Sequence, residues 1–298
     1  MPARGGSKGI PGKNLKFLDG RPLIAYILDK LLGVEIIDQI VVTSDDEMIL
    51  DFCASYYPKI FCIRRPSELA KDNVTLDPVI YHAYQELSKL DHFNYIFTFQ
   101  PTSPLLKKQT IEKAINKLIN SNSDTLITVT DSRHLYWTLK KGKYKPIYKK
   151  RLNRQQLPPY FKETGAILGC SDTVISNQSR IGKRISLLEV SKEESIDIDD
   201  YIDWVLVENL IQQPNFGIVV RANKEIGMGH VYRMLIIAYA VNTKVNFFIP
   251  YKDTLAIQKI KESFYKLTTI YWGLLKPKSS ILHITANFYA GFFPPQPQ

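Results

Sequence analysis

The sequence has little cysteine and no long apolar run, and these absences exclude several classes of protein. Cys53, Cys62 and Cys170 are the only cysteines among 298 residues, and none forms a C-x-x-C pair. A disulfide framework or a cysteine-based metal site is therefore not expected, and a reducing cytoplasm fits. No apolar run approaches the roughly 20 residues that span a bilayer, and no signal-peptide pattern opens the chain. We expect a cytoplasmic protein with no membrane partner.

Acidic residues are fewer than basic ones, and the formal net charge is +10. The densest basic stretch runs from Lys140 to Lys145 and continues at 149–151, with tyrosines between the cations. Such a stretch suits stacking on nucleic-acid bases. Its alternation with Tyr144 and Pro146 is more typical of an exposed strand and turn. We interpret it as a solvated hairpin arm and expect no nucleic-acid partner.

Apolar strand patterns alternate with amphipathic helical ones through the first two thirds of the chain. Strands are predicted at 39–43, 95–99 and 125–129, with helical segments at 76–90 and 108–121. This order predicts a doubly wound, mostly parallel, Rossmann-like α/β sheet. Ligands of such sheets bind beyond the carboxyl ends of the strands, which is where polar residues follow each predicted strand.

The pattern changes near residue 213. A helix is predicted from about 200 to Gln213, Pro214 and Asn215 break it, and a new strand is predicted at 216–220. We therefore predict a first domain at 1–213 and a partial second α/β unit at 214–298, which is short for an independent domain of this class. The last residues, 292–298, have no evident structural destination and are interpreted as a frayed end.

Residues 2–14, hereafter loop 1, read Pro-Ala-Arg-Gly-Gly-Ser-Lys-Gly-Ile-Pro-Gly-Lys-Asn. The segment holds four glycines and three cations. Glycines let backbone N–H groups approach an anion, and cations offset phosphate charge. The Walker pattern G-x-x-x-x-G-K-[ST] does not occur here, and a flexible basic terminus is the alternative. Loop 1 is therefore a candidate phosphate-binding loop.

Loop 1 as a string resembles the first motif of the CMP-sialic acid synthetase family. Further matching pieces follow in order: Arg65-Pro66 with 69–72, Gln100-Pro101-Thr102-Ser103-Pro104, Arg154-Gln155 and Asp197-Ile198-Asp199. The resemblance covers about residues 1–210. It implies a CTP-dependent cytidylyltransferase that forms a CMP-activated, sialic-acid-like (nonulosonic) sugar and releases pyrophosphate.

The resemblance also implies roles for residues on the nucleotide side. CTP binding falls to Arg4, Ser7, Lys8, Lys13, Asn14 and Arg65. Among them, Lys8, Arg4 and Lys13 are the candidates for catalysis through their charge. For Arg65 a surface ion pair is the alternative reading, and Arg64 is interpreted as such a residue.

Asp197 and Asp199 stand two residues apart, so on a strand they would project from one face while Ile196 and Ile198 pack on the other. Two carboxylates beside a phosphate-bearing substrate suit Mg²⁺, and the resemblance points to metal at the same pair. The alternative is an N-cap before the following helix. We assign Asp197 and Asp199 to Mg²⁺ and Asp200 to the helix start.

The acid-sugar contacts implied by the resemblance are Gln100, Arg154 and Gln155, where a guanidinium suits a carboxylate. Three features depart from the family. No full hydrophobic strand stands before Pro2, Leu106 replaces a usual arginine, and Glu163-Thr164-Gly165-Ala166 replaces a usual Asn-Gly. The last two changes lie on the sugar side, so the particular sugar stays open. A synthetase for 3-deoxy-octulosonic acid is a rival, but that family lacks the Gly-Gly-Ser-Lys-Gly spelling.

The segment 221–233 carries a glycine loop and His230. It resembles the opening motif of the UDP-sugar hydrolase of pseudaminic acid biosynthesis, in which the matching histidine is catalytic. Such enzymes need a second lobe, so we expect little hydrolase activity. A hydrolase centred on His230 and an inactive remnant remain alternative functions. Related synthetases often dimerise through the arm near 135–160, so a homodimer is a further hypothesis.

Overall fold

The computed structural model describes residues 1–212, 216–221, 227–240, 245–250, 252–263, 265–270 and 282–284. The chain divides into two compact units, Met1–Ile211 and Gln212–Gln298, which are described separately. Two stretches singled out in the sequence lie outside the described residues: 222–226, which is part of the segment 221–233, and the end at 292–298.

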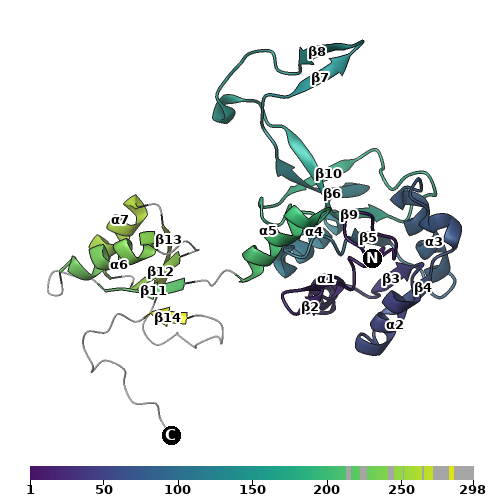
Figure 1. Ribbon diagram of the computed structural model, residues 1–298, viewed down its shortest axis with the longest axis horizontal. Helices are drawn as coiled ribbons and strands as arrows, with labels where there is room; N and C mark the ends of the chain where they lie inside the picture. The colour runs from purple at the N-terminus through teal and green to yellow at the C-terminus, as the bar shows by residue number, and fades with distance from the viewer. Residues whose placement is uncertain are drawn as a thin grey trace, which may run out of the picture. The chain divides into compact units, whose positions relative to one another are not determined.

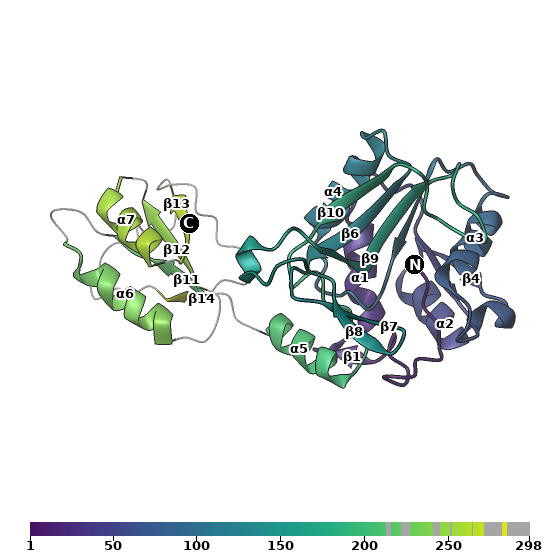
Figure 2. The same ribbon diagram turned by 90° about the horizontal axis from the view of Figure 1, so that it is seen from above.

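The main sheet of the first unit has four strands in the order β10-β6-β9-β5 (Figure 2). They are β5 (Tyr95–Phe99), β6 (Thr125–Asp131), β9 (Phe161–Ser171) and β10 (Ile185–Glu189). β6 and β10 pair in parallel, whereas β9 is antiparallel to both β5 and β6. The α/β class is confirmed, but this sheet is more mixed than predicted, because β9 enters it without the helical crossover that a parallel strand needs.

A second, parallel pair of strands is formed by β3 (Val41–Ser44) and β4 (Phe61–Arg64). The first residues of the chain lie along β3 in the same direction. Ala3 N donates to Thr43 O at 3.0 Å, and Thr43 N donates to Met1 O at 3.1 Å. Loop 1 therefore starts at the carboxyl end of β3, the end where the sheet rule places ligands.

The helices of the first unit are α1 (Leu23–Leu32), α2 (Glu47–Tyr56), α3 (Leu76–Leu87), α4 (Lys108–Ile119) and α5 (Tyr201–Gln212), with short 3₁₀ turns η1 (Ser67–Ala70) and η2 (Arg154–Gln156). Two-residue strands β1 (Phe17–Leu18) and β2 (Arg21–Pro22) precede α1. On α4, Ile111, Ala114, Ile115 and Leu118 are buried, at the spacing of one helix face. They share the main core with Phe99 of β5, so the helix covers the sheet that carries the site.

The basic stretch forms an antiparallel hairpin of β7 (Trp137–Lys140) and β8 (Lys143–Pro146). All of β8 is exposed. The two turn residues, Lys141 and Gly142, have φ values of 50° and 72°, the left-handed pair that tight hairpins use. In Figure 1 the hairpin projects away from the main sheet. The prediction of an exposed hairpin arm is confirmed.

The second unit contains a parallel sheet in the order β13-β12-β11-β14. Its strands are β11 (Phe216–Val219), β12 (Val245–Pro250), β13 (Lys266–Ile270) and β14 (Leu282–Ile284), and its helices are α6 (Gly229–Ala240) and α7 (Thr254–Glu262). Phe247 and Ile249 of β12, Val231 of α6 and Ile260 of α7 form a core of their own. The predicted strand at 216–220 is present as β11.

Among the described residues, no helix combines the length and the apolar character that crossing a bilayer requires.

Candidate active site

Loop 1 is held in place from inside the first unit. Asn14 is buried, and its side-chain amide donates to Arg4 O at 2.9 Å across the loop. Ile10 is fully buried in a cluster with Leu23, Ile198 and Trp204. The predicted nucleotide role of Asn14 stays a prediction, and the structure gives this side chain a bracing contact within the loop.

Loop 1 meets the acidic segment 197–199, which is about 185 residues away along the chain. The Lys13 ammonium donates to Ile198 O at 2.6 Å. Gly9 lies so close to this segment that a Cβ built on it would stand 2.1 Å from Asp199 O. The fold therefore brings the predicted phosphate-binding loop and the predicted metal carboxylates together.

The segment 195–199 is not a strand, contrary to the expected geometry. Its place is fixed instead by a backbone bond from Ile198 N to Thr102 O at 2.8 Å and by burial of Ile198. Asp197 is half-buried, and its Oδ1 has no hydrogen-bond partner. Burial raises the pKa of Asp197, the nearby carboxylate of Asp199 adds to this rise, and Thr102 and Lys13 oppose it. An unpartnered buried carboxylate oxygen calls for a cation or a donor.

Asp200, not Asp199, caps the helix that follows. Its carboxylate accepts from the N–H groups of Ile202 at 2.8 Å and Asp203 at 3.0 Å, and the Asp203 carboxylate accepts in return from Asp199 N and Asp200 N. This is reciprocal capping of α5. The assignment of Asp200 to the helix start is confirmed, and the exposed Asp199 carboxylate is not used for the cap.

Asp197 and Asp199 fit a magnesium ion in chemistry but not as a complete site. In the described part of the chain, no three His, Cys, Asp or Glu side chains gather around a common point. Two carboxylates supply hard oxygen ligands, and Mg²⁺ usually takes the rest from water and substrate phosphates. The buried free Oδ1 of Asp197 supports this arrangement.

Arg65 is buried, so its alternative reading as a surface ion-pair residue is wrong. Its Nη2 donates to Thr43 O at 2.9 Å, and its Nε is buried without a partner. Burial lowers the pKa of Arg65, and nearby Asp45 opposes that effect. Arg64 instead forms an exposed ion pair with Glu47, as interpreted from the sequence.

The other candidate cations of loop 1, Arg4 and Lys8, are 41% and 75% exposed at their side chains. Both contact Asp72, at 2.9 Å and 2.7 Å. Ser7 is half-buried, and its N–H donates to Gly5 O at 3.0 Å. These side chains stand at the surface of the loop, where a triphosphate can reach them.

Gln100, a predicted sugar contact, follows β5 directly and lies beside Gly165 of β9. A Cβ on Gly165 would stand 3.3 Å from Gln100 Nε2 and 3.8 Å from Asp197 Oδ2. Gly165 has a φ of 73°, a conformation that favours glycine. The structure thus brings Gln100 and Asp197 to one point, and Gly165 is the residue between them. In the sequence, residues 163–166 stood out only as a departure from the family. The glycine just after the arm was the one feature that could have pointed to Gly165 as part of the site.

Arg154 and Gln155 lie in η2, and both are exposed. The charge of Arg154 acts on Asp131, at the carboxyl end of β6. Hydrogen bonds from Arg133 lower the pKa of Asp131 to about 2, and the Arg154 charge contributes to this lowering. Arg154 lies on η2, an element separate from the end of β5 that holds Gln100.

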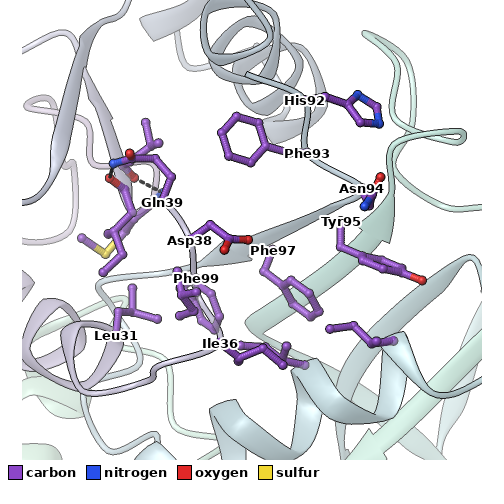
Figure 3. A pocket seen from close by; sticks show the side chains of 16 residues that line it. Leu31, Ile36, Asp38, Gln39, His92, Phe93, Asn94, Tyr95, Phe97 and Phe99 are labelled. Atoms are coloured by element: carbon purple, nitrogen blue, oxygen red, sulfur yellow. Dashed lines mark hydrogen bonds between the residues drawn. The ribbon is translucent and has the colours of Figure 1, made fainter. Parts of the chain in front are cut away.

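A cavity of about 460 Å³ lies elsewhere, at the amino ends of β3 and β5. Figure 3 shows Phe97 and Phe99 of β5 facing Leu31, Ile36 and Asp38 across it. Its lining, which belongs wholly to the described range 1–212, contains no lysine or arginine. A triphosphate needs cations, so this cavity is not the nucleotide site.

His230 lies in the second unit, half-buried in the first turn of α6. The loop before it, 222–226, is outside the described residues. Its predicted role in a hydrolase-like unit stays a prediction.

Comparison with known families finds a match to the cytidylyltransferase family over residues 1–194. CMP-N,N'-diacetyllegionaminic acid synthase of Legionella pneumophila is 30% identical over 221 residues, which cover 71% of this chain and 94% of that protein. Pseudaminic acid cytidylyltransferase of Campylobacter jejuni is 33% identical over 132 residues, which cover 44% of this chain and 56% of that protein.

Solved structures show the same fold at low identity. A CMP:2-keto-3-deoxy-manno-octonic acid synthetase complexed with CTP matches with a TM-score of 0.52 at 15% identity, over 70% of this chain and 95% of that one. A 4-diphosphocytidyl-2C-methyl-D-erythritol synthase from Anaerococcus prevotii matches with a TM-score of 0.51 at 15% identity, over 71% and 95%. At this identity the likeness concerns the fold of the first unit.

Proposed function

The chain belongs to the cytidylyltransferase family and is a CTP-dependent nucleotidyltransferase, and we propose that it activates a nine-carbon acidic (nonulosonic) sugar as its CMP derivative. The second product is pyrophosphate. The relatives named for legionaminic and pseudaminic acids support a sugar of this class.

The contact between loop 1 and segment 197–199 carries the proposal. Lys13 reaches Ile198 O, and Gly9 packs on Asp199 O, so the loop with the three cations touches the segment that carries Asp197 and Asp199. Cations alone would suit any anion, and carboxylates alone would suit a cation. Their juxtaposition suits a metal-bound triphosphate.

In the proposed reaction, the anomeric hydroxyl oxygen of the sugar attacks the α-phosphorus of CTP. A new P–O bond forms there, the bond from the α-phosphorus to the bridging oxygen breaks, pyrophosphate leaves with the electron pair, and the hydroxyl proton passes to water. Arg4, Lys8 and Lys13 hold the phosphate oxygens and offset the developing charge. Positioning and electrostatics account for the rate, because no covalent enzyme intermediate is needed.

Asp197 and Asp199 would hold Mg²⁺, which would neutralise phosphate charge when bound. Ser7 adds a hydroxyl to the phosphate contacts, and buried Arg65, fixed to Thr43 O, faces the nucleotide base. On the sugar side, Gln100 beside Gly165 orients the acceptor, and Arg154 with Gln155 meets its carboxylate.

The proposal also covers the oligomeric state of the enzyme and its cellular compartment. Trp137, Leu139 and Tyr144 are exposed on the hairpin, which supports a homodimer formed through the arm. Size-exclusion chromatography with light scattering tests this, and a monomer would overturn it. The three free thiols support a cytoplasmic enzyme.

The test of function is pyrophosphate release from CTP and Mg²⁺ with a panel of nine-carbon acid sugars. The native chain is compared with Lys8→Ala, and with Lys113→Ala on the exposed side of α4 as a matched control. Sugar-dependent release that is lost only in Lys8→Ala supports the proposal and identifies the sugar. Absence of release with every nine-carbon sugar, or release with an eight-carbon acid sugar instead, overturns it.

A further inference from the structure

The two exposed cations of loop 1 share a single acidic partner from a distant segment. Asp72 Oδ1 accepts from Arg4 Nη1 at 2.9 Å, and Asp72 Oδ2 lies 2.7 Å from Lys8 Nζ. The hydrogen bond from Lys8 holds the pKa of Asp72 below its usual value, and Arg4 adds to the effect. One ionised carboxylate thus forms ion pairs with both Arg4 and Lys8.

The backbone of loop 1 is engaged in a similar way. Gly5 N donates to Asp45 Oδ1 at 3.3 Å, and Asp45 follows directly on β3. Glycine N–H groups in such a loop are the donors that a phosphate would use. Carboxylates therefore contact both a backbone donor and the two exposed cations of the loop.

Asp72 lies on a segment that starts at a buried anchor, Arg65. Arg65 is buried and bonded to Ser44 O and Thr43 O, and η1 follows from Ser67 to Ala70. Asp72 comes two residues later, with its side chain 52% exposed. Arg65 anchors the start of this segment, and the half-exposed Asp72 carboxylate can be displaced from the two cations.

We propose that Asp72 is a positioning residue that holds Arg4 and Lys8 until the triphosphate of CTP takes its place, and holds them again when pyrophosphate leaves. The proposal rests on the proposed function, which gives these two cations to CTP. A triphosphate carries more negative charge than one carboxylate, so the exchange is favourable. The contact still competes with every phosphate ligand of the loop.

The structure therefore gives Asp72 an effect on affinity and not on the chemical step. Asp72→Asn removes the charge and keeps the shape, whereas Asp72→Glu keeps the charge. Asp51→Asn, on the exposed side of α2, changes the net charge equally and serves as the control. Binding of CTP, and of pyrophosphate, to the full chain with Mg²⁺ is measured by titration calorimetry.

We expect Asp72→Asn to bind both ligands with a Kd about two- to fivefold lower, the range of an exposed ion pair. Asp72→Glu and Asp51→Asn should bind as the native chain does. Amide hydrogen exchange of Gly5, Gly6 and Gly9 without nucleotide should be faster in Asp72→Asn only, at an unchanged Tm.

Unchanged binding and exchange in Asp72→Asn would overturn the proposal. Weaker binding would also overturn it, because Asp72 would then contact the nucleotide or its metal. If the native chain binds no CTP, the proposed function fails along with the competition, yet faster exchange in Asp72→Asn would still establish the contact within the loop.

Discussion

The two sides of the site are built differently. On the proposed nucleotide side, loop 1 and segment 197–199 are joined by the bond from half-buried Lys13 to Ile198 O and by the packing of Ile10 and Ile198 in one buried cluster. On the proposed sugar side, Gln100 follows the end of β5 and lies beside Gly165 within β9, but Arg154 and Gln155 lie on an exposed turn of the arm region. A tightly packed side tolerates little change, and an exposed side can vary in sequence without loss of the fold.

This difference explains why CTP use can be read from the chain while the particular sugar cannot. The contacts that fix loop 1 depend on backbone approach and burial, which few substitutions preserve. The contacts expected for the sugar depend on long side chains that pack against few neighbours. Variants on the two sides should therefore differ in both size and kind of effect.

The largest effect is expected from Asp197→Asn. If Asp197 supplies an oxygen to Mg²⁺, loss of its charge should lower kcat/KM by about 10²- to 10³-fold, as for other groups that offset transition-state charge, and raise the Mg²⁺ concentration needed for half-maximal rate. Asp200→Asn is the matched control, since asparagine also caps helices well. Equal, small losses in both variants would mean that Asp197 holds no metal.

Gly9→Ala should follow, with a loss of about 100-fold in kcat/KM, because a misplacement of about 1 Å has effects of this size. Its new Cβ would stand 2.1 Å from Asp199 O, so loop 1 and segment 197–199 must move apart. Gly6→Ala is the control, because nothing lies within 4 Å of a Cβ there. Steady-state rates and Tm should change for Gly9→Ala alone. A Gly9→Ala enzyme with native kinetics would show that the two segments act independently.

On the sugar side, Arg154→Ala should raise the KM for the sugar about tenfold, the effect of one charge-assisted hydrogen bond. The KM for CTP should stay the same. Arg151→Ala, whose recorded contact is the Tyr148 hydroxyl at 3.3 Å, is the control. A rise in the KM for CTP after Arg154→Ala would place this arginine on the nucleotide side and remove the contrast.

The arm region also allows a pH test. Arg133 lowers the pKa of Asp131 to about 2, from 3.8. A lowered pKa stabilises the fold above the unfolded-state value, and this contribution is lost as the pH falls from about 4 to about 2. Because Asp131 stays ionised above pH 5, its titration should not change the KM for the sugar in that range. A carbon NMR titration should show the pKa of Asp131 rising toward 3.8 in Arg133→Ala but not in Arg184→Ala. An Asp131 that titrates near 3.8 in the native chain would contradict this.

Local patterns in the sequence predicted local elements well. The run at 95–99 is β5, and the amphipathic pattern at 108–121 is α4 with slightly shorter bounds. β9 was missed because Glu163, Gly165 and Gly169 interrupt its apolar pattern. Gly169 is needed there because a Cβ would stand 2.3 Å from the Phe97 ring. The packing of Phe97 from β5 therefore requires a glycine in β9, and that glycine made the strand look like a loop in the sequence.

The candidate site shows the same limit. Loop 1 and the carboxylates could be singled out by composition and resemblance, but the contact between Lys13 and Ile198 joins residues 185 positions apart. The pairing of Asp72 with Arg4 and Lys8, and the place of Gly165, likewise depend on tertiary approach. No periodicity within a short window contains that information.

The smallest effect is expected from His230→Ala. The second unit has its own core, and the family match covers residues 1–194, so neither side of the site should need this histidine. We expect unchanged pyrophosphate release and unchanged KM values for CTP and sugar. Release of UDP from a UDP-sugar should be absent in both the native chain and the variant, as measured by chromatography of the nucleotides. UDP release by the native chain that His230→Ala abolishes would establish a second activity in this unit, whereas a loss of pyrophosphate release would show that the cytidylyl site depends on it.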